Sequence, residues 1–113
     1  MLGWRSLDNI SLLTTIRDDS FERPQVIFKH STRCGTSSGA LSRMNRNSDP
    51  QGADLYLLDI IRYREISNAI AGEFGITHES PQLLLISSGK VVYHESHSSI
   101  SFDVLEDQLQ NIK

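Results

Sequence analysis

The feature that most limits how this chain can fold is the segment from Gln25 to His30, which has Val26, Ile27 and Phe28 at its centre. Its β-branched and aromatic side chains predict a strand that is buried on both faces and therefore lies in the middle of a sheet. A short polar turn follows directly, at residues 31–33, and the pattern after it predicts a helix from about Gly35 towards Arg46. A buried strand that passes straight into a helix is typical of an α/β fold.

The other predicted elements continue this alternation of strands and helices. Strands are predicted at residues 4–7 and 55–60, and residues 82–87 and 91–94 are predicted to pair as a hairpin. Helices are predicted at residues 10–17 and at 66–74, where Gly75 stops the helix, and a last helix is capped near Ser101. Strands joined through helices pair in parallel by right-handed crossovers, so we expect a mixed sheet with helices on both faces. At 113 residues the chain is expected to form one domain, residues 1–113.

Composition and charge narrow the function classes. The net charge of −3 and the lack of a Lys/Arg cluster argue against a nucleic-acid partner. Apolar runs such as Leu83–Ile86 are too short to span a bilayer, so no membrane partner is expected. The first residues show no signal peptide, and one cysteine cannot form an internal disulfide, which together predict a reducing, cytoplasmic location.

The single cysteine, Cys34, lies where the polar turn becomes the helix. In α/β sheets the reactive site lies at this kind of place, beyond the carboxyl end of a central strand. Free backbone N–H groups and the positive end of the helix dipole favour an anion there, so the thiol is expected to ionise more easily than usual. Thr32 is the predicted cap of the helix. The alternative is that Cys34 is an inert, small hydrophobic residue.

Several neighbours of Cys34 are candidates for stabilising a thiolate. Ser37 follows in a Cys-Gly-Thr-Ser spacing, at the place where a dithiol motif has its second cysteine. A hydroxyl cannot resolve a disulfide, but it can donate a hydrogen bond to sulfur. Thr36, in the same tetrapeptide, is a further candidate. The candidate cations are Arg33, Lys29 and His30, and for each the alternative is a solvated charge or a satisfied polar group.

A strand, a cysteine at the following helix start and a later proline before a β-hairpin resemble the thioredoxin fold. Within that fold, the run Phe28-Lys29-His30-Ser31-Thr32-Arg33-Cys34, the pair Ser37-Ser38 and the segment Ser80-Pro81-Gln82 resemble the YtxJ-type monothiol bacilliredoxins. Residues 4–7 and 88–92 are also similar to that family, so the resemblance covers essentially the whole chain. Gly35 departs from it, because many relatives carry proline at that position.

This resemblance implies a cytoplasmic redox protein that removes the low-molecular-weight thiol bacillithiol from modified protein cysteines. Cys34 would be the attacking thiolate and would take bacillithiol onto itself as a mixed disulfide. Free bacillithiol, as a co-substrate, or a partner reductase would then regenerate the thiol. The implied partners are bacillithiolated protein cysteines, and no bound cofactor is implied.

The resemblance also implies a role for Pro81 in substrate binding. In the thioredoxin fold this proline follows a cis bond and lies against the redox cysteine, and the preceding residue, here Ser80, offers backbone hydrogen bonds to an extended substrate. The alternative is an ordinary trans proline at the start of a strand. Many thioredoxins have a buried acid six residues before the first cysteine, but Phe28 occupies that position, so a carboxylate relay is not expected.

Two other functions stay open at this level. Cys34-Gly35-Thr36-Ser37 is close to the Cys-Gly-Phe-Ser motif of monothiol glutaredoxins, which carry an iron–sulfur cluster, but the Gly-Gly and Cys-Asp pairs of their glutathione pocket have no counterpart after Pro81. The other is a non-catalytic interaction module with the thioredoxin fold. The segment His94–His97 lacks the spacing of zinc proteases, so we expect solvated loop histidines and no metal site there.

Overall fold

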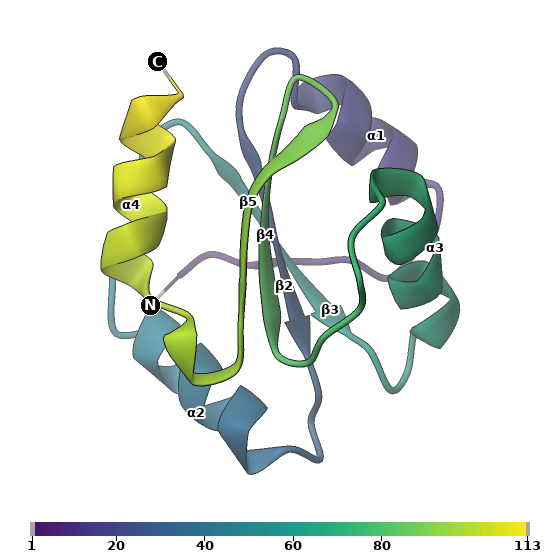
Figure 1. Cartoon of the computed structure of the whole chain (residues 1–113), viewed down its shortest axis with the longest axis vertical. Coiled ribbons are helices and arrows are strands. Elements are labelled where there is room, and N and C mark those ends of the chain that lie inside the picture. Colours follow the sequence, from purple (N-terminus) through teal and green to yellow (C-terminus); the bar gives the residue numbers. More distant parts are fainter. Residues whose placement is uncertain (1, 113) are drawn as a thin grey trace.

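The computed structural model describes residues 2–112, which form a five-stranded sheet with helices on both of its faces (Figure 1). The strands are β1 (Arg5–Ser6), β2 (Gln25–His30), β3 (Asp54–Asp59), β4 (Gln82–Ser87) and β5 (Lys90–Ser96). The helices are α1 (Leu12–Asp19), α2 (Gly35–Met44), α3 (Arg64–Phe74) and α4 (Phe102–Asn111), with a 3₁₀ turn, η1 (His97–Ser99), before the last. Among these described helices, none is long and apolar enough to cross a membrane.

The sheet is mixed, as predicted, and its strand order is β1-β3-β2-β4-β5. β3 pairs in parallel with both β1 and β2, whereas β4 runs antiparallel to both β2 and β5. β2 therefore lies at the centre, with β3 on one side and β4 on the other. The expected α/β class, with a mixed sheet between helices, is confirmed.

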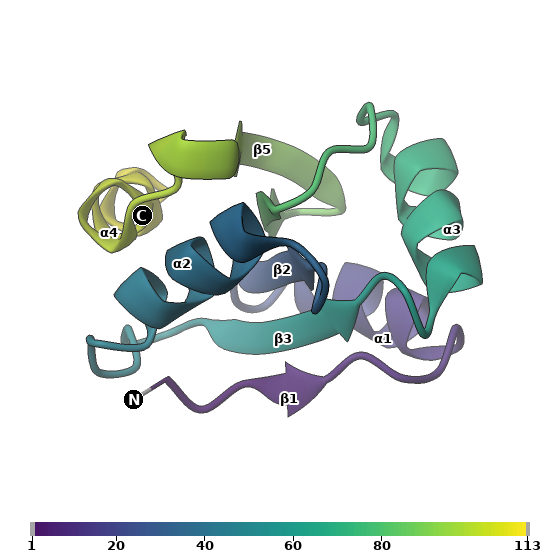
Figure 2. The ribbon, with the colours of Figure 1, turned by 90° about the horizontal axis from the view of Figure 1, so that it is seen from below.

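The helices form two layers, one on each face of the sheet (Figures 1 and 2). α2 and α4 cover one face, and α1 and α3 cover the other. Val26 and Phe28 of β2 enter the hydrophobic core under α2 and α4, whereas Ile27 enters the core under α1 and α3. β4 alternates in the same way over residues 83–86. Because both strands contribute to two cores, consecutive residues at their centres are apolar, at 26–28 in β2 and 83–86 in β4.

The helix ends agree with the predicted stop and cap signals. Gly75 ends α3 in the left-handed conformation, with a φ of 66°. The Ser101 side chain caps α4 by accepting a hydrogen bond from Val104 N. α1 begins two residues later than predicted, at Leu12, and α2 ends two residues earlier, at Met44, which is the usual uncertainty of helix ends.

The β4–β5 hairpin is longer than predicted. β5 reaches Ser96 because it pairs with β4 along its whole length. His94 lies on this strand, as the predicted range 91–94 implied, and not in the loop expected for the histidines of 94–97; its side chain is exposed as expected. Ser88 and Gly89, with φ values of 52° and 79°, form a two-residue turn. Ser20 holds this turn by accepting hydrogen bonds from both of its N–H groups.

Candidate active site

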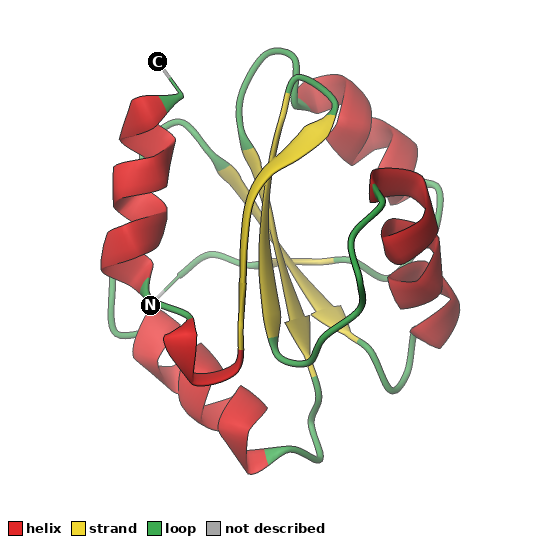
Figure 3. Ribbon diagram, viewed as in Figure 1, coloured by secondary structure: helices red, strands yellow, loops and turns green. Residues whose placement is uncertain are grey.

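Cys34 lies where β2 ends and α2 begins, at the carboxyl end of the central strand. In Figure 3 the connecting loop is the green segment that runs down from the sheet to the lowest helix, α2. Cys34 is the N-cap residue of α2 and has an extended backbone, with φ −112° and ψ 120°. Its N–H donates to Ser31 O over 3.2 Å, and its carbonyl accepts from Ser38 N over 3.0 Å. The thiol is free and the residue is only partly buried. The predicted place of Cys34, at a strand-to-helix turn, is confirmed; we call residues 31–34 the reactive turn.

The prediction that Thr32 caps α2 is wrong. The hydrogen bond from Cys34 N to Ser31 O closes the turn and moves the helix start beyond Thr32, so that Cys34 itself occupies the N-cap position. Thr32 is exposed, and within the described chain no side-chain hydrogen bond caps α2. An N-cap side chain is the group that normally accepts from the N–H groups of the first helical turn. Here that side chain is the thiol of Cys34.

Ser37 is fully buried, and its hydroxyl has two neighbours. It accepts a hydrogen bond from Ser31 N over 2.9 Å and lies 2.7 Å from Nδ1 of His30. The hydroxyl therefore links the end of β2, the reactive turn and the first turn of α2. For residues 2–112 the structure records no hydrogen bond from Ser37 to the sulfur of Cys34, so a direct action of Ser37 on the thiolate stays a prediction.

His30 is the last residue of β2, and its partly buried ring lies beside Phe28, with ring centroids 6.3 Å apart. Burial lowers the pKa of His30 below its ordinary value, and the nearby charge of Asp59 opposes this shift only in part. The ring is therefore neutral near pH 7. Under these conditions His30 acts as a hydrogen-bond donor or acceptor rather than as a cation.

Arg33 and Thr36 flank Cys34, and both side chains are exposed. Neither takes part in any side-chain hydrogen bond or ion pair recorded between residues 2 and 112. Water screens an exposed charge, which limits what Arg33 contributes before a substrate covers it. Their action on the thiolate stays a prediction.

The prediction that Lys29 acts on Cys34 is wrong, because its side chain points to the other face of the sheet. Lys29 follows Phe28 in β2 and therefore enters the layer of α1 and α3, whereas Cys34 starts a helix of the opposite layer. Lys29 is fully buried, and its Nζ lies 3.3 Å from Nδ1 of His78 and 3.4 Å from the Ser67 carbonyl oxygen of α3. Burial lowers the pKa of Lys29 to about 8. No carboxylate in the described residues forms an ion pair with it.

The Ser80–Pro81 peptide bond is cis, as predicted. Pro81 immediately precedes β4, and β4 pairs antiparallel with β2 through Gln82 and Lys29. Pro81 therefore lies beside the end of β2 that leads into the reactive turn. Its carbonyl accepts a hydrogen bond from His97 N over 3.0 Å, which joins the start of β4 to η1, and η1 packs against α2.

The side chains around this proline are polar. The Ser80 hydroxyl oxygen is buried and has no hydrogen-bond partner in the described part of the chain. Nε2 of His97 lies 2.9 Å from Oε1 of Glu79, and both side chains are exposed. The turn at Pro81 therefore carries an unused polar atom next to the reactive turn. A substrate-binding role for Ser80 and Pro81 stays a prediction.

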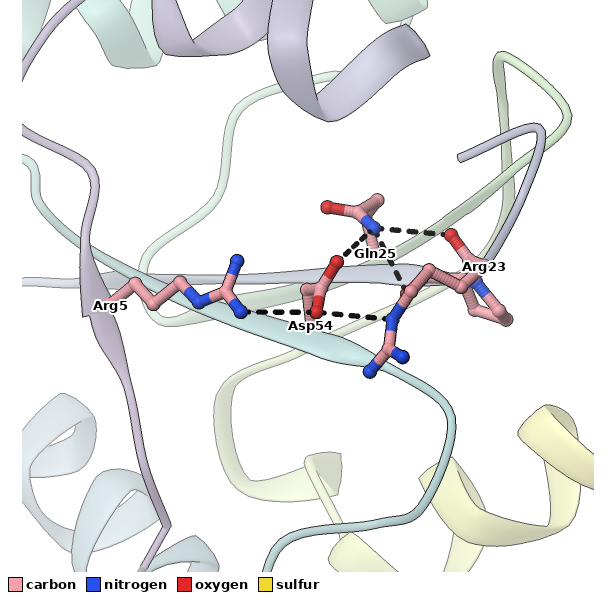
Figure 4. A network of polar contacts seen from close by, with 5 residues as sticks. Arg5, Arg23, Gln25 and Asp54 are labelled. Atoms are coloured by element: carbon pink, nitrogen blue, oxygen red, sulfur yellow. Dashed lines mark hydrogen bonds and ion pairs between the residues drawn. The ribbon is translucent and has the colours of Figure 1, made fainter. Parts of the chain in front are cut away.

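A second polar cluster, at the opposite end of β2, was not predicted from the sequence (Figure 4). Asp54 is nearly buried and pairs with Arg5 over 3.3 Å and with Arg23 over 3.1 Å, while Gln25 donates to it over 2.7 Å. These residues come from β1, the loop after α1, β2 and β3, so only the folded chain brings them together. We call this group the Asp54 cluster. It contains no nucleophile and fixes the starts of the strands.

Comparison with known proteins gives two findings. A family model described as monothiol bacilliredoxin BrxC matches residues 5–105. A solved structure described as having a thioredoxin fold, and proposed to be an oxidoreductase, is 25% identical, with a TM-score of 0.76 over 93% of this chain and 91% of its own. The thioredoxins of Malassezia sympodialis and Trypanosoma brucei brucei both give a TM-score of 0.74, at 12% and 15% identity, over 96% and 97% of this chain and 90% of their own. The predicted thioredoxin-like fold is confirmed.

Proposed function

Because the chain belongs to the monothiol bacilliredoxin family, as its motifs predicted, we propose that it exchanges disulfides through Cys34 and removes bacillithiol from modified protein cysteines. The family and the thioredoxin fold support a thiol redox role. The finer proposal is carried by the position of Cys34, the only cysteine of the chain, as the N-cap residue of α2. A thiolate there is stabilised by the first-turn N–H groups and the positive end of the helix dipole.

In the proposed step, the Cys34 thiolate attacks the bacillithiol sulfur of a disulfide between bacillithiol and a protein cysteine. A new S–S bond forms between Cys34 and bacillithiol, and the old S–S bond breaks. Its electron pair leaves with the protein cysteine, which departs as a thiolate. One disulfide is exchanged for another, so the step involves no net oxidation or reduction. The substrate protein is restored, and Cys34 now carries bacillithiol.

Regeneration of Cys34 needs a thiol from outside the chain. Ser37 occupies the position of the second cysteine in a dithiol motif, and its hydroxyl cannot form a disulfide with Cys34. Free bacillithiol, or the thiol of a partner reductase, attacks the adduct instead; with bacillithiol the product is its disulfide. A reducing cytoplasm supplies such thiols, and this scheme uses no bound cofactor.

We place the substrate against the turn that contains Ser80 and Pro81. This turn lies beside the end of β2 from which the chain enters the reactive turn. The buried hydroxyl of Ser80 is not used by the described protein groups and is available to a substrate that rearranges this turn slightly. Arg33 and Thr36, exposed on either side of Cys34, are the proposed thiolate-stabilising groups from the sequence that remain open to such a substrate.

The test is transfer of bacillithiol from a bacillithiolated protein to the wild type, to Cys34→Ala and to Ser38→Ala, an exposed neighbour in α2 that serves as the matched control. Mass spectrometry should show the wild type and Ser38→Ala gaining one bacillithiol each while the substrate loses it. Cys34→Ala should gain none. Equal loss of bacillithiol from the substrate with wild type and Cys34→Ala would contradict the proposal and favour a non-catalytic module.

A further inference from the structure

The hydroxyl of Ser37 has a single proton, and its contacts decide where that proton goes. A hydroxyl donates once and can accept twice. The Ser31 N–H can only donate, so Ser37 Oγ accepts there, over 2.9 Å. Within residues 2–112 the only acceptor recorded for the Ser37 proton is Nδ1 of His30, at 2.7 Å. Because Ser37 is fully buried, a proton without an acceptor would be unfavourable, so Ser37 donates to Nδ1.

This assignment fixes the tautomer of His30. A neutral imidazole carries one proton, and a ring that accepts at Nδ1 carries its proton on Nε2. Nε2 lies on a different edge of the ring from Nδ1, and it has no hydrogen-bond partner among the residues described. The ring is partly buried, which keeps it neutral near pH 7. One N–H at the reactive end of β2 is therefore not used by the protein itself.

We propose that Ser37 is a positioning residue, which holds His30 so that its Nε2–H donates a hydrogen bond to the thiolate leaving in the exchange reaction. This proposal rests on the proposed function of Cys34. Its geometric support is that His30 ends β2, that Pro81 lies beside this end in the antiparallel register, and that Cys34 starts α2 only four residues later. The thiol site, the substrate turn and the free N–H thus occupy the same end of the sheet.

The hydrogen bond acts on the charge that the exchange step creates. As the S–S bond of the substrate breaks, its electron pair collects on the departing sulfur, and a donor already in place stabilises that charge. His30 keeps its proton throughout, because a neutral imidazole only shares Nε2–H, and water then protonates the released thiolate. When an external thiol regenerates Cys34, the departing sulfur is that of Cys34, and the same N–H serves it.

The competing arrangement is a direct hydrogen bond from Ser37 to the Cys34 thiolate. Ser37 would then have no proton for His30, and the ring would have to donate from Nδ1 to the Ser37 oxygen. The two arrangements therefore place the ring proton on different nitrogens. Nitrogen-15 spectra of the reduced wild-type protein near pH 7 distinguish them, with the His30 signal identified by its loss in His30→Gln. A proton on Nε2 is expected, and a proton on Nδ1 would overturn the proposal.

Matched variants test the kinetic role. Ser37→Ala removes both contacts, whereas Ser38→Ala changes the exposed residue beside it. We expect Ser37→Ala to slow bacillithiol transfer roughly tenfold, which corresponds to about 1.4 kcal/mol, and to give a mixture of His30 tautomers. Ser38→Ala should change neither. Ser37→Ala with the wild-type rate would overturn the proposal.

A second pair of variants keeps the test decisive if Ser37→Ala does not fold. His30→Gln retains an N–H near the place of Nε2, whereas His30→Phe keeps a ring without any donor. His30→Gln should retain most of the transfer rate and His30→Phe should lose roughly tenfold, again about 1.4 kcal/mol. Equal rates for the two would overturn the proposal. If the wild type itself transfers no bacillithiol, the proposed function fails; if it does so and the variants keep its rate, only the role of Ser37 and His30 fails.

Discussion

The two ends of β2 differ in how their polar side chains are partnered. At its start, the carboxylate of Asp54 is nearly buried but faces two guanidinium groups and the amide of Gln25 (Figure 4). At its end, the amine of Lys29 is fully buried with no ion pair to a carboxylate of residues 2–112, and Nε2 of His30 has no described protein partner. The same strand thus begins beside a buried charge that has two ion-pair partners and ends beside a buried charge that has hydrogen-bond contacts but no carboxylate partner among the described residues.

This difference separates residues that stabilise the fold from residues that can take part in the proposed reaction. A buried charge is costly unless it is paired and hydrogen-bonded, so the Asp54 cluster is arranged as a structural site. The buried charge without a carboxylate partner lies at the end that carries Cys34 and the turn at Pro81. Proteins tolerate such local costs at functional sites. Changes at the start of β2 should therefore alter stability alone, whereas changes at its end can alter both.

The largest gain in stability is expected for Lys29→Met, which removes the unpaired charge. Burial lowers the pKa of Lys29 from its ordinary 10.5 to about 8. This shift sets the cost of holding the charged amine in the folded protein at up to about 3 kcal/mol. Lys29→Met should therefore raise the free energy of unfolding near pH 7 by about 1 to 3 kcal/mol, measured by urea denaturation.

The pKa shift of Lys29 also fixes the sign of a pH dependence. Between pH 8 and 10.5 the unfolded chain holds more protons at Lys29 than the folded chain does, so the wild type should gain stability as the pH rises through this window. Below pH 8 the full cost remains. Lys29→Met should lack the gain. If the free energies of unfolding of the two proteins change in parallel between about pH 7.5 and 9.5, the pKa of Lys29 is not lowered in the folded protein, which would contradict this prediction.

The next effect in size is expected for Asp54→Asn, at the paired end. The neutral amide leaves Arg5 and Arg23 without their shared charge, and because both guanidinium groups are half exposed we expect a loss of about 2 kcal/mol of stability. Glu73→Gln, which breaks the exposed pair with Arg17, is the matched control and should cost less than about 0.5 kcal/mol. Bacillithiol transfer should be unchanged in both. A slower transfer in Asp54→Asn would break the separation between the two ends.

The smallest effect is expected for Gly35→Pro, which stiffens the reactive end. Gly35 is the first residue of α2, an added Cβ there meets nothing within 4 Å, and the extended backbone of Cys34 suits a residue before proline. We expect a gain of about 0.5 kcal/mol, because proline restricts the unfolded chain. Gly39→Pro, in the interior of α2, should instead lose about 3 kcal/mol. Proline lacks the backbone N–H that Gly35 has. A change in the rate of bacillithiol transfer by Gly35→Pro would therefore show that the exchange reaction depends on the Gly35 N–H or on motion at the start of α2.

The elements of this fold follow from local patterns. β2 and β4 occur at the predicted residues because each has a central run of apolar residues that folding buries. Gly75 and Ser101 end and cap their helices through conformations that depend on few neighbours. The placement of Cys34 also follows locally, since the residues before it read as a strand and those after it as a helix. The family resemblance added the cis bond at Pro81, which no periodicity indicates.

Side-chain partners were much less predictable. Alternation along β2 separates Lys29 from Phe28, but it does not say which face α2 will cover once the chain has passed the reactive turn. The partners of Ser37 depend on how that turn closes, and Thr32 was excluded as a cap by one backbone hydrogen bond. The Asp54 cluster joins segments far apart in the chain. These features belong to the tertiary structure.

Because it contains a single cysteine, the native chain can also be used to identify its own partners. A mixed disulfide formed on Cys34 meets no neighbouring cysteine of the same chain, since the sequence contains no other. Its lifetime is set by thiols in the surroundings, so rapid quenching with acid should preserve covalent complexes without prior mutation. Any cysteine of another protein recovered in such a complex was joined through Cys34, and each copy of the chain can hold only one such cysteine.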